Sequence, residues 1–352
     1  MMKLQLFGLL ASLAIFAAGC TKEVKAPPTG DSQQSPTQST ATGEPGKTPD
    51  KEEPAAPMVV IIPDASRLLI EQLGAKIEDS GDQERVVLPK DLTDEDLKKL
   101  AAVPEIRRID WENATISDTA MQHLADMKQL ESLNLYRSSF DDSSLDHLKK
   151  LPNLKHLSLV STKVTNEDVK FVGAMKQLEE LRLENTLIDG EVLQTIAELT
   201  ELRVLTLGAT KVTGTDLAFL QQLTKLTELN LLELDVNDAD LAHVEPFQNL
   251  QKLNLLRTHV SDAGLAHLQG LSKLATLSLR AAAIQGPGLT HLAKLPVLET
   301  LHLQETKLSD QSIPNFEGLT RLRTLFVGQT QITDEGAKRL EAVLPDCSVR
   351  NF

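Results

Sequence analysis

An aliphatic residue recurs every 24 residues through most of this chain, and no other feature constrains its fold as strongly. A second and a third leucine follow three and five residues later, as in Leu154, Leu157 and Leu159. Because the copies follow one another without an insertion, each must form the same small unit, and neighbouring units must stack to bury their apolar faces. The ten opening residues are Ile106, Leu130, Leu154, Leu178, Leu202, Leu226, Leu250, Leu274, Leu298 and Leu322.

The repeat resembles that of the leucine-rich-repeat family. The family pattern L-x-x-L-x-L-x-x-N/C-x-L is met by Leu154, Leu157, Leu159, Thr162 and Val164. Within the family, the chain is most similar to the ribonuclease-inhibitor-like subclass and to secreted bacterial leucine-rich-repeat lipoproteins. The resemblance implies an α/β solenoid shaped like a horseshoe, with a parallel sheet on its concave face and short helices on its convex face.

The chain departs from the family pattern at the position that is usually Asn or Cys. Most repeats carry a hydroxyl residue there, and Ala114, Leu234 and Ala282 interrupt the column. Because a buried polar backbone group needs a partner, we expect these hydroxyls to bond backbone groups in the turn after each strand. The hydroxyl residues are Ser138, Thr162, Thr186, Thr210, Thr258, Thr306 and Thr330.

The second half of each repeat has the pattern of a short helix. Apolar residues recur at helical spacing, as at Leu265, Leu268 and Leu271, after a column of good N-cap residues. We interpret the acidic residues that often follow the cap as stabilising the helix dipole, because no copy has the alternating acidic spacing of a calcium loop. The caps are Ser117, Asp141, Thr165, Asp189, Thr213, Asn237, Ser261, Ser309 and Thr333, and the acidic residues are Asp118, Asp142, Asp238, Asp262, Asp310 and Asp334.

The first twenty residues have the features of a bacterial lipoprotein signal peptide. Lys3 precedes an apolar stretch at residues 4–18, which is shorter than the about 20 residues that a membrane-spanning helix needs. The stretch ends in Ala17-Ala18-Gly19-Cys20, which resembles a lipobox, although Ala17 stands where Leu is usual. The resemblance implies processing by the lipoprotein signal peptidase and a lipid on the Cys20 thiol. The alternative is an ordinary secretory signal.

Residues 21–57 are rich in Pro, Thr, Ser, Gln and charged residues, and none is aromatic. Such a segment cannot bury enough apolar area to offset its ordering entropy, so we expect a disordered tether. Thr21 rather than Asp follows Cys20, so the resemblance implies a lipid-anchored cell-envelope protein, with the outer membrane favoured if the organism has one. The expected order is a signal peptide at 1–20, the tether at 21–57, an N-terminal cap with a degenerate first repeat at 58–105, ten repeats at 106–345 and a C-terminal cap at 346–352.

Charge and motifs narrow the class of function. The formal net charge of −14 argues against a nucleic-acid partner, because phosphate backbones are bound by clustered Lys and Arg. Cys20 and Cys347 are the only cysteines, so we expect no disulfide framework and a buried Cys347 in the C-terminal cap. The motifs of P-loops, dinucleotide-binding folds, zinc proteases and serine hydrolases do not occur. We therefore expect no cofactor, no metal and no catalytic residue.

Two polar patterns could suggest chemistry but have simpler explanations. Five histidines share one column, yet successive helices lie about 8–10 Å apart, whereas zinc needs ligand atoms about 2 Å from one ion. Asp110 and Glu112 have a spacing compatible with the carboxylate pair of a glycoside hydrolase, but they lie near an edge of the array, so we interpret them as a solvated acidic strand. The histidine column is His123, His147, His243, His267 and His291.

The concave face is the expected binding surface, because its outward side chains alternate with the core leucines. Leu232 and Leu256 are neighbours in adjacent strands and are flanked by Arg257 and Arg280, which predicts an exposed apolar patch with a basic rim. Exposed aromatic residues on this face could anchor an interface. The candidate ligand-binding residues are Tyr136, Arg182, Leu232, Leu256, Arg257, Arg280, His302 and Phe326.

These features predict a monomeric, membrane-anchored interaction module that binds a protein or peptide on its concave face and is not an enzyme. The alternative is a structural or carbohydrate-contacting component of the cell envelope, in which the solenoid acts mainly as a spacer. One coherent patch on the concave face would favour specific binding, whereas a uniformly polar face would favour the spacer.

Overall fold

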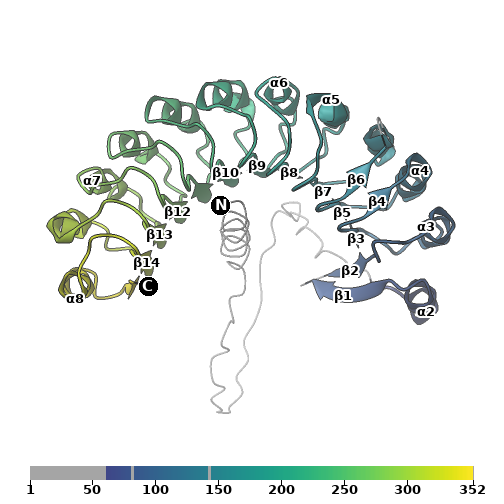
Figure 1. Ribbon diagram of the computed structural model, residues 1–352, viewed down its shortest axis with the longest axis horizontal. Coiled ribbons are helices and arrows are strands. Elements are labelled where there is room, and N and C mark those ends of the chain that lie inside the picture. The colour runs from purple at the N-terminus through teal and green to yellow at the C-terminus, as the bar shows by residue number, and fades with distance from the viewer. Residues whose placement is uncertain (1–60, 81–82, 142–143, 352) are drawn as a thin grey trace, which may run out of the picture. The chain divides into compact units, whose positions relative to one another are not determined.

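The structure is a computed structural model that describes residues 61–80, 83–141 and 144–351. Its strands line the inner side of an arc and its helices line the outer side (Figure 1). The solenoid with a long sheet and short helices, expected from the repeat, is thereby confirmed. The signal peptide expected at 1–20, with Cys20, and the tether expected at 21–57 lie outside the described residues. Within the described part, no helix has the length and hydropathy required to cross a membrane.

Over the described residues, the main sheet has thirteen strands that follow one another in chain order. From β2 onward all neighbours are parallel and most pair with a shift of one repeat, so Leu229 lies opposite Leu253. The first pair, β1 and β2, is an antiparallel hairpin that covers the N-terminal edge. The strands are β1 (Lys76–Ser80), β2 (Gln83–Val87), β3 (Arg108–Asp110), β5 (Ser132–Asn134), β7 (His156–Ser158), β8 (Glu180–Arg182), β9 (Val204–Thr206), β10 (Glu228–Asn230), β11 (Lys252–Asn254), β12 (Thr276–Ser278), β13 (Thr300–His302), β14 (Thr324–Phe326) and β15 (Ser348–Arg350), and a separate pair is formed by β4 (Thr115–Ile116) and β6 (Ser139–Phe140).

The outer side of the arc contains both α-helices and 3-10 helices. A 3-10 helix rises about 2.0 Å per residue against 1.5 Å in an α-helix, so it covers the same height with fewer residues in a short repeat. The helices are α2 (Asp64–Gln72), α3 (Asp94–Ala101), α4 (Asp118–Asp126), η1 (Ser144–Lys150), α5 (Asn166–Val169), η2 (Lys170–Ala174), α6 (Val192–Ile196), η3 (Gly214–Gln222), η4 (Ala239–Val244), η5 (Gly264–Leu268), α7 (Leu289–Leu292), η6 (Asp310–Phe316) and α8 (Asp334–Val343).

The core lies between the sheet and the helices and is almost entirely aliphatic. The leucines of the repeat are buried throughout, as at Leu154, Leu157 and Leu159. Near the N-terminal end Trp111 is also buried, and its indole nitrogen donates to the Pro89 carbonyl at 2.9 Å. Cys347 lies beside β15 and is only half-buried against the core, so it is less covered than the sequence predicted.

The hydroxyl column bonds the backbone as expected. In six repeats the Thr hydroxyl donates to the carbonyl three residues earlier at 2.6–2.8 Å, as from Thr186 to Leu183. Ser138 donates to the Trp111 carbonyl at 2.9 Å and accepts from the Ala114 N–H at 3.1 Å. The serine therefore serves the neighbouring repeat, in which Ala114 lacks a hydroxyl of its own.

One residue in every repeat adopts a left-handed backbone at the turn that follows the strand. Ten non-glycine residues have φ between 53° and 59°. The N–H groups of nine of them, from Asn113 to Glu305, donate to carbonyls of the next repeat, as from Ala209 to Leu232 at 2.8 Å, so the stacking of repeats holds the turn in place. The residues are Asn113, Arg137, Ser161, Asn185, Ala209, Glu233, Arg257, Ala281, Glu305 and Gln329.

The acidic column after the caps links one repeat to the next, which the dipole interpretation alone does not describe. The Asp262 carboxylate accepts the N–H groups of Gln285 at 2.8 Å, Gly286 at 3.0 Å and Gly288 at 2.8 Å. Asp238 and Asp310 likewise accept the N–H groups of Ser261 and Thr333 in the following repeats. A Cβ atom on Gly288 would lie 2.3 Å from the Asp262 carbonyl oxygen, so the glycine allows this close contact.

Candidate functional site

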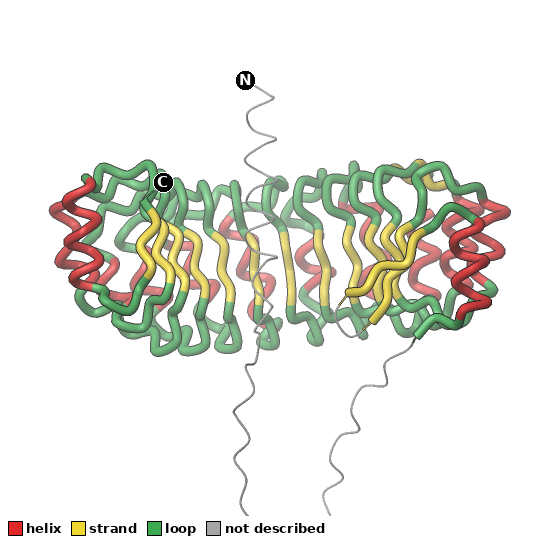
Figure 2. Tube along the Cα trace, turned by 90° about the horizontal axis from the view of Figure 1, so that it is seen from below, coloured by secondary structure: helices red, strands yellow, loops and turns green. Residues whose placement is uncertain are grey.

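The concave face presents two or three side chains from each strand. Figure 2 looks onto this face and shows the strands lying side by side. In the three-residue strands other than β15 the middle residue is buried in the core and its two neighbours lie on the concave side, as in β8, where Glu180 and Arg182 flank Leu181. The residue two positions further along, such as Glu184, continues the outward row.

A charged cluster occupies β7 and β8. The Arg182 Nε donates to Glu180 Oε1, and His156 Nδ1 lies 3.2 Å from the other oxygen of Glu180. Burial by itself would raise the pKa of Glu180, but the hydrogen bond with His156 and the charge of Arg182 outweigh it and lower that pKa to about 2. The carboxylate is therefore ionised at neutral pH and holds both partners.

Glu184 extends this cluster toward the centre of the sheet. Its side chain is 2% exposed, and it accepts hydrogen bonds from the Thr206 hydroxyl and from the Asn230 amide, the latter at 3.1 Å. Burial raises the pKa of Glu184, although Thr206 and Arg182 act in the opposite direction. The hydrogen bonds tie three adjacent strands, β8, β9 and β10, into one polar network.

A shallow hollow lies in front of the cluster. Arg182 borders it, and among the described residues the two terminal guanidinium nitrogens have no hydrogen-bond partner. These nitrogens can donate to an acceptor on a ligand, because a guanidinium presents five N–H donors and Glu180 uses only one of them. The hollow is lined by Ser132, Leu133, Asn134, His156, Leu157, Ser158, Glu180 and Arg182.

The exposed apolar patch predicted at Leu232 and Leu256 is not present in the structure. The two side chains follow adjacent strands, as expected, but they are only 1% and 5% exposed. Gly208 lies beside Leu232, and a Cβ atom there would approach the Leu232 Cγ to 2.5 Å. Because Gly208 has no side chain, Leu232 lies against the backbone of the neighbouring strand.

The expected basic rim is also changed. Arg257 belongs to the left-handed turn rather than to the strand, and its guanidinium lies 2.7 Å from the Glu233 carboxylate. Arg280 donates from Nε to Glu305 at 2.8 Å. Both arginines are therefore neutralised by a carboxylate from an adjacent repeat.

His302 and Phe326 come together on β13 and β14. Their rings are stacked, with centroids 4.4 Å apart and planes inclined by 4°. Burial and, to a smaller extent, the charge of Arg280 lower the pKa of His302 to about 4, so its ring is neutral at physiological pH. Both residues were candidates from the sequence, but their direct contact was not expected.

The remaining candidate and the acidic pair lie in the N-terminal half of the face. Tyr136 is partly exposed, and the Arg137 guanidinium carbon lies 4.9 Å from the centre of its ring. Asp110 pairs with Arg85 at 2.9 Å, and Glu112 accepts from the Asn134 amide at 3.0 Å. Burial raises the pKa of Asp110 more than Arg85 lowers it. Asn134 also lowers the pKa of Asp110, so both acids interact with this amide.

The candidates from the sequence included Arg182 but not Glu180, which holds it, nor His156 and Glu184, which complete the cluster. A usable signal was present, because the three consecutive outward positions that begin β8 are all charged, as they also are at Arg108, Asp110 and Glu112 of β3. In the histidine column, His147 lies 2.9 Å from Asp118 and His267 lies 2.6 Å from Glu245. Over residues 61–80, 83–141 and 144–351, no group of three or more His, Cys, Asp or Glu side chains is placed to hold a metal ion.

The sequence matches a known family profile, and the fold is similar to that of several solved structures. A family profile described as "Leucine-rich repeat region" matches residues 166–349. No curated protein matches the sequence. Among solved structures, an internalin (inlF) from Listeria monocytogenes is 20% identical, with a TM-score of 0.54, over 82% of this chain and 94% of that chain.

Two receptor structures also share the fold. The ectodomain of the Arabidopsis receptor kinase HAESA, solved with an IDA peptide hormone ligand, is 17% identical with a TM-score of 0.53, over 72% of this chain and 43% of that chain. A TLR13–ssRNA13 complex is 19% identical with a TM-score of 0.52, over 74% of this chain and 38% of that chain. This chain therefore spans less than half of either receptor, and identities this low show the fold alone.

Proposed function

Because this chain belongs to the leucine-rich-repeat family, we propose that it is an interaction module that binds a protein or peptide ligand on the concave face of its sheet. The curvature of a solenoid creates an extended concave surface of the kind that repeat proteins use for binding. The fold is typically a non-enzymatic scaffold, and no catalytic residue is part of this proposal.

The observation that carries the proposal is the hollow in front of β5, β7 and β8. Arg182 is fixed there by Glu180, while its terminal nitrogens have no partner among the described residues. A guanidinium held in this way suits an acceptor such as a backbone carbonyl or a carboxylate of a peptide, because little side-chain entropy is lost on binding. Ser158 and His156 add donors beside it.

The similar solved structures contain more than one class of ligand, and the net charge of this chain favours one of these classes. HAESA was solved with a peptide and TLR13 with a single-stranded RNA. A net charge of −14 disfavours a polyanion and favours the peptide class for this chain.

In this proposal a lipid on Cys20 anchors the module in the cell envelope as a monomer, and residues 21–57 provide the reach. We expect Cys20→Ser to move the protein from the membrane fraction to the soluble fraction of the native organism. Retention of the variant in the membrane fraction would contradict the anchor and leave the concave-face proposal untouched.

Photo-crosslinking in the native envelope tests the binding face. A benzophenone amino acid at Ser158 in the hollow should give a discrete protein or peptide adduct, whereas the same label at exposed Gln269 on the outer side should not. Arg182→Gln should remove the adduct at Ser158. Equal adducts at both positions, or none at either, would refute the proposal, and the absence of adducts would favour the role of a spacer.

A further inference from the structure

At one position of the repeat, a single residue differs in type from its equivalents in the other repeats. Two residues after the ladder position, nine repeats carry an aliphatic side chain that is buried, whereas Phe140 is only partly buried. A phenyl ring is larger than the slot that the other repeats fill with Val, Ile or Leu. The aliphatic residues are Ile116, Val164, Ile188, Val212, Val236, Val260, Ile284, Leu308 and Ile332.

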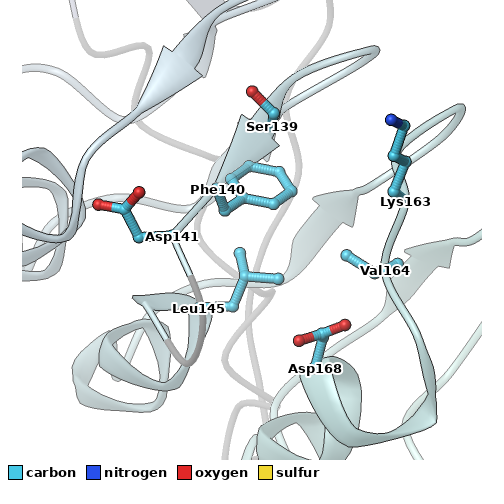
Figure 3. A pocket seen from close by; sticks show the side chains of 7 residues that line it. All are labelled: Ser139, Phe140, Asp141, Leu145, Lys163, Val164 and Asp168. Atoms are coloured by element: carbon cyan, nitrogen blue, oxygen red, sulfur yellow. The ribbon is translucent and has the colours of Figure 1, made fainter.

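The Phe140 ring forms one wall of a second hollow, away from the strands of the concave sheet. Leu145 and Val164 are buried and form its apolar floor (Figure 3). Asp141 and Asp168 lie at its border, and Lys163 extends from the opposite loop away from Asp168 (Figure 3). Ser139 completes the lining.

Both carboxylates are held in place by the backbone of the solenoid. Asp168 accepts the Thr165 N–H at 2.8 Å and its hydroxyl at 2.7 Å, both on Oδ2. Asp141 accepts the Asp118 N–H at 2.9 Å on Oδ2. A carboxylate has about four acceptor sites on its two oxygens, so each acid can accept from a ligand in addition to these bonds.

We propose that this hollow, defined by Phe140, Leu145, Val164, Asp141 and Asp168, binds an arginine side chain of a partner protein. The aliphatic stem would pack on the apolar floor, as the stems of long basic side chains do. The guanidinium would lie against the Phe140 ring and donate to the carboxylates of Asp141 and Asp168.

Charge complementarity selects this occupant over an acidic or purely apolar one. Two fixed carboxylates border the hollow against one lysine, and the chain as a whole is acidic. The two carboxylates would repel an acidic side chain, and an apolar side chain would form neither an ion pair nor a hydrogen bond with them. The site lies apart from the Arg182 hollow, so it goes beyond the proposed concave-face function.

Methyl NMR of the full-length protein can test the inference with small probes. N-acetylarginine amide should shift the methyl signals of Leu145 and Val164 saturably, and N-acetylcitrulline amide, its neutral analogue, should bind at least fivefold more weakly. The equivalent methyl groups two repeats later, Leu193 and Val212, should not shift, because that repeat has Ile188 in place of Phe140.

Two variants separate recognition from folding. Phe140→Val restores the side chain of the other repeats, so it should retain the fold and weaken the arginine probe at least fivefold. Lys163→Gln removes the one like charge and should tighten the probe by twofold or more. Equal affinity for both probes, or unchanged affinity in either variant, would overturn the proposal.

Discussion

The bond between Asp262 and the next repeat gives a direct test of how the solenoid is held together. Asp262→Ala removes the acceptor for three N–H groups, of which those of Gly286 and Gly288 belong to buried residues. The third, on exposed Gln285, can turn to water. Because an unsatisfied buried N–H costs about 1–3 kcal/mol, we expect the free energy of unfolding to fall by about 2–6 kcal/mol.

The chain provides a matched control in the same column. Asp334 follows the N-cap Thr333 at the start of α8, but among the described residues its carboxylate accepts no hydrogen bond from another repeat. A helix-dipole effect would make both substitutions cost about 0.3–1 kcal/mol. The inter-repeat bond makes Asp262→Ala costly and leaves Asp334→Ala within that small range.

Urea denaturation followed by two signals is the suitable assay. Circular dichroism reports all repeats, whereas Trp111, the only tryptophan, reports the N-terminal end. Loss of the hydrogen bonds to Asp262 should make the circular dichroism signal change at a lower urea concentration than the Trp111 fluorescence, because a repeat array is stabilised by contacts between neighbours. Equal costs for the two aspartates, with coincident transitions, would refute the reasoning.

Three further predictions follow from single contacts. Gly288→Ala should destabilise the protein by more than about 2 kcal/mol, because its Cβ would lie 2.3 Å from backbone, whereas Gly270→Ala, with its nearest atom at 4.0 Å, should be close to neutral in the same urea assay. Ala281→Gly should raise the free energy of unfolding by about 1 kcal/mol, because alanine is strained at φ 55°, whereas Ala263→Gly, at φ −67°, should not. The pKa of Glu180 lies near 2 instead of 4.5, which corresponds to a contribution of about 3 kcal/mol to stability. This contribution should be present above pH 4.5 and be lost as the pH falls from 4.5 to 2. Glu180→Gln should therefore flatten that part of the stability–pH curve.

The results that would contradict these predictions are equally specific. Similar costs for both glycine substitutions would mean that the neighbouring repeat moves aside easily. A loss of stability in Ala281→Gly would mean that the flexibility of the unfolded glycine outweighs the strain. An unchanged acid limb in Glu180→Gln would mean that His156 and Arg182 do not favour the ionised carboxylate in the folded state.

The period of the sequence was sufficient to predict strand order and most of the register. A translation by 24 residues places Leu229 opposite Leu253 and carries each ladder hydroxyl to the same turn. The left-handed residues could not be predicted in this way. They include Arg137, Ala209 and Glu305, which have no shared preference for that conformation, because inter-repeat hydrogen bonds from their N–H groups hold the turn.

At the candidate site, the alternation of residues along each strand predicted which side chains face the concave side but not their exposed fractions. Leu232 was expected to be exposed, yet Gly208 leaves a space beside it that the leucine fills. Cover on a sheet depends on the neighbouring strand as well as on the residue itself. The contacts that hold Arg182 could not be predicted either. Glu180 on the same strand bonds Arg182, and His156 on the preceding strand bonds Glu180.

In a solenoid of nearly identical repeats, a side chain that fits its column is explained by stacking alone. Functional evidence must therefore come from departures that stacking does not require. Gly208 is a departure that the neighbouring Leu232 compensates, so it needs no further explanation. Phe140 is larger than its slot and leaves a hollow, and Arg182 has donors without a partner among the described residues, so neither is compensated within the repeat array. These two positions are where a ligand would contribute what the array itself does not.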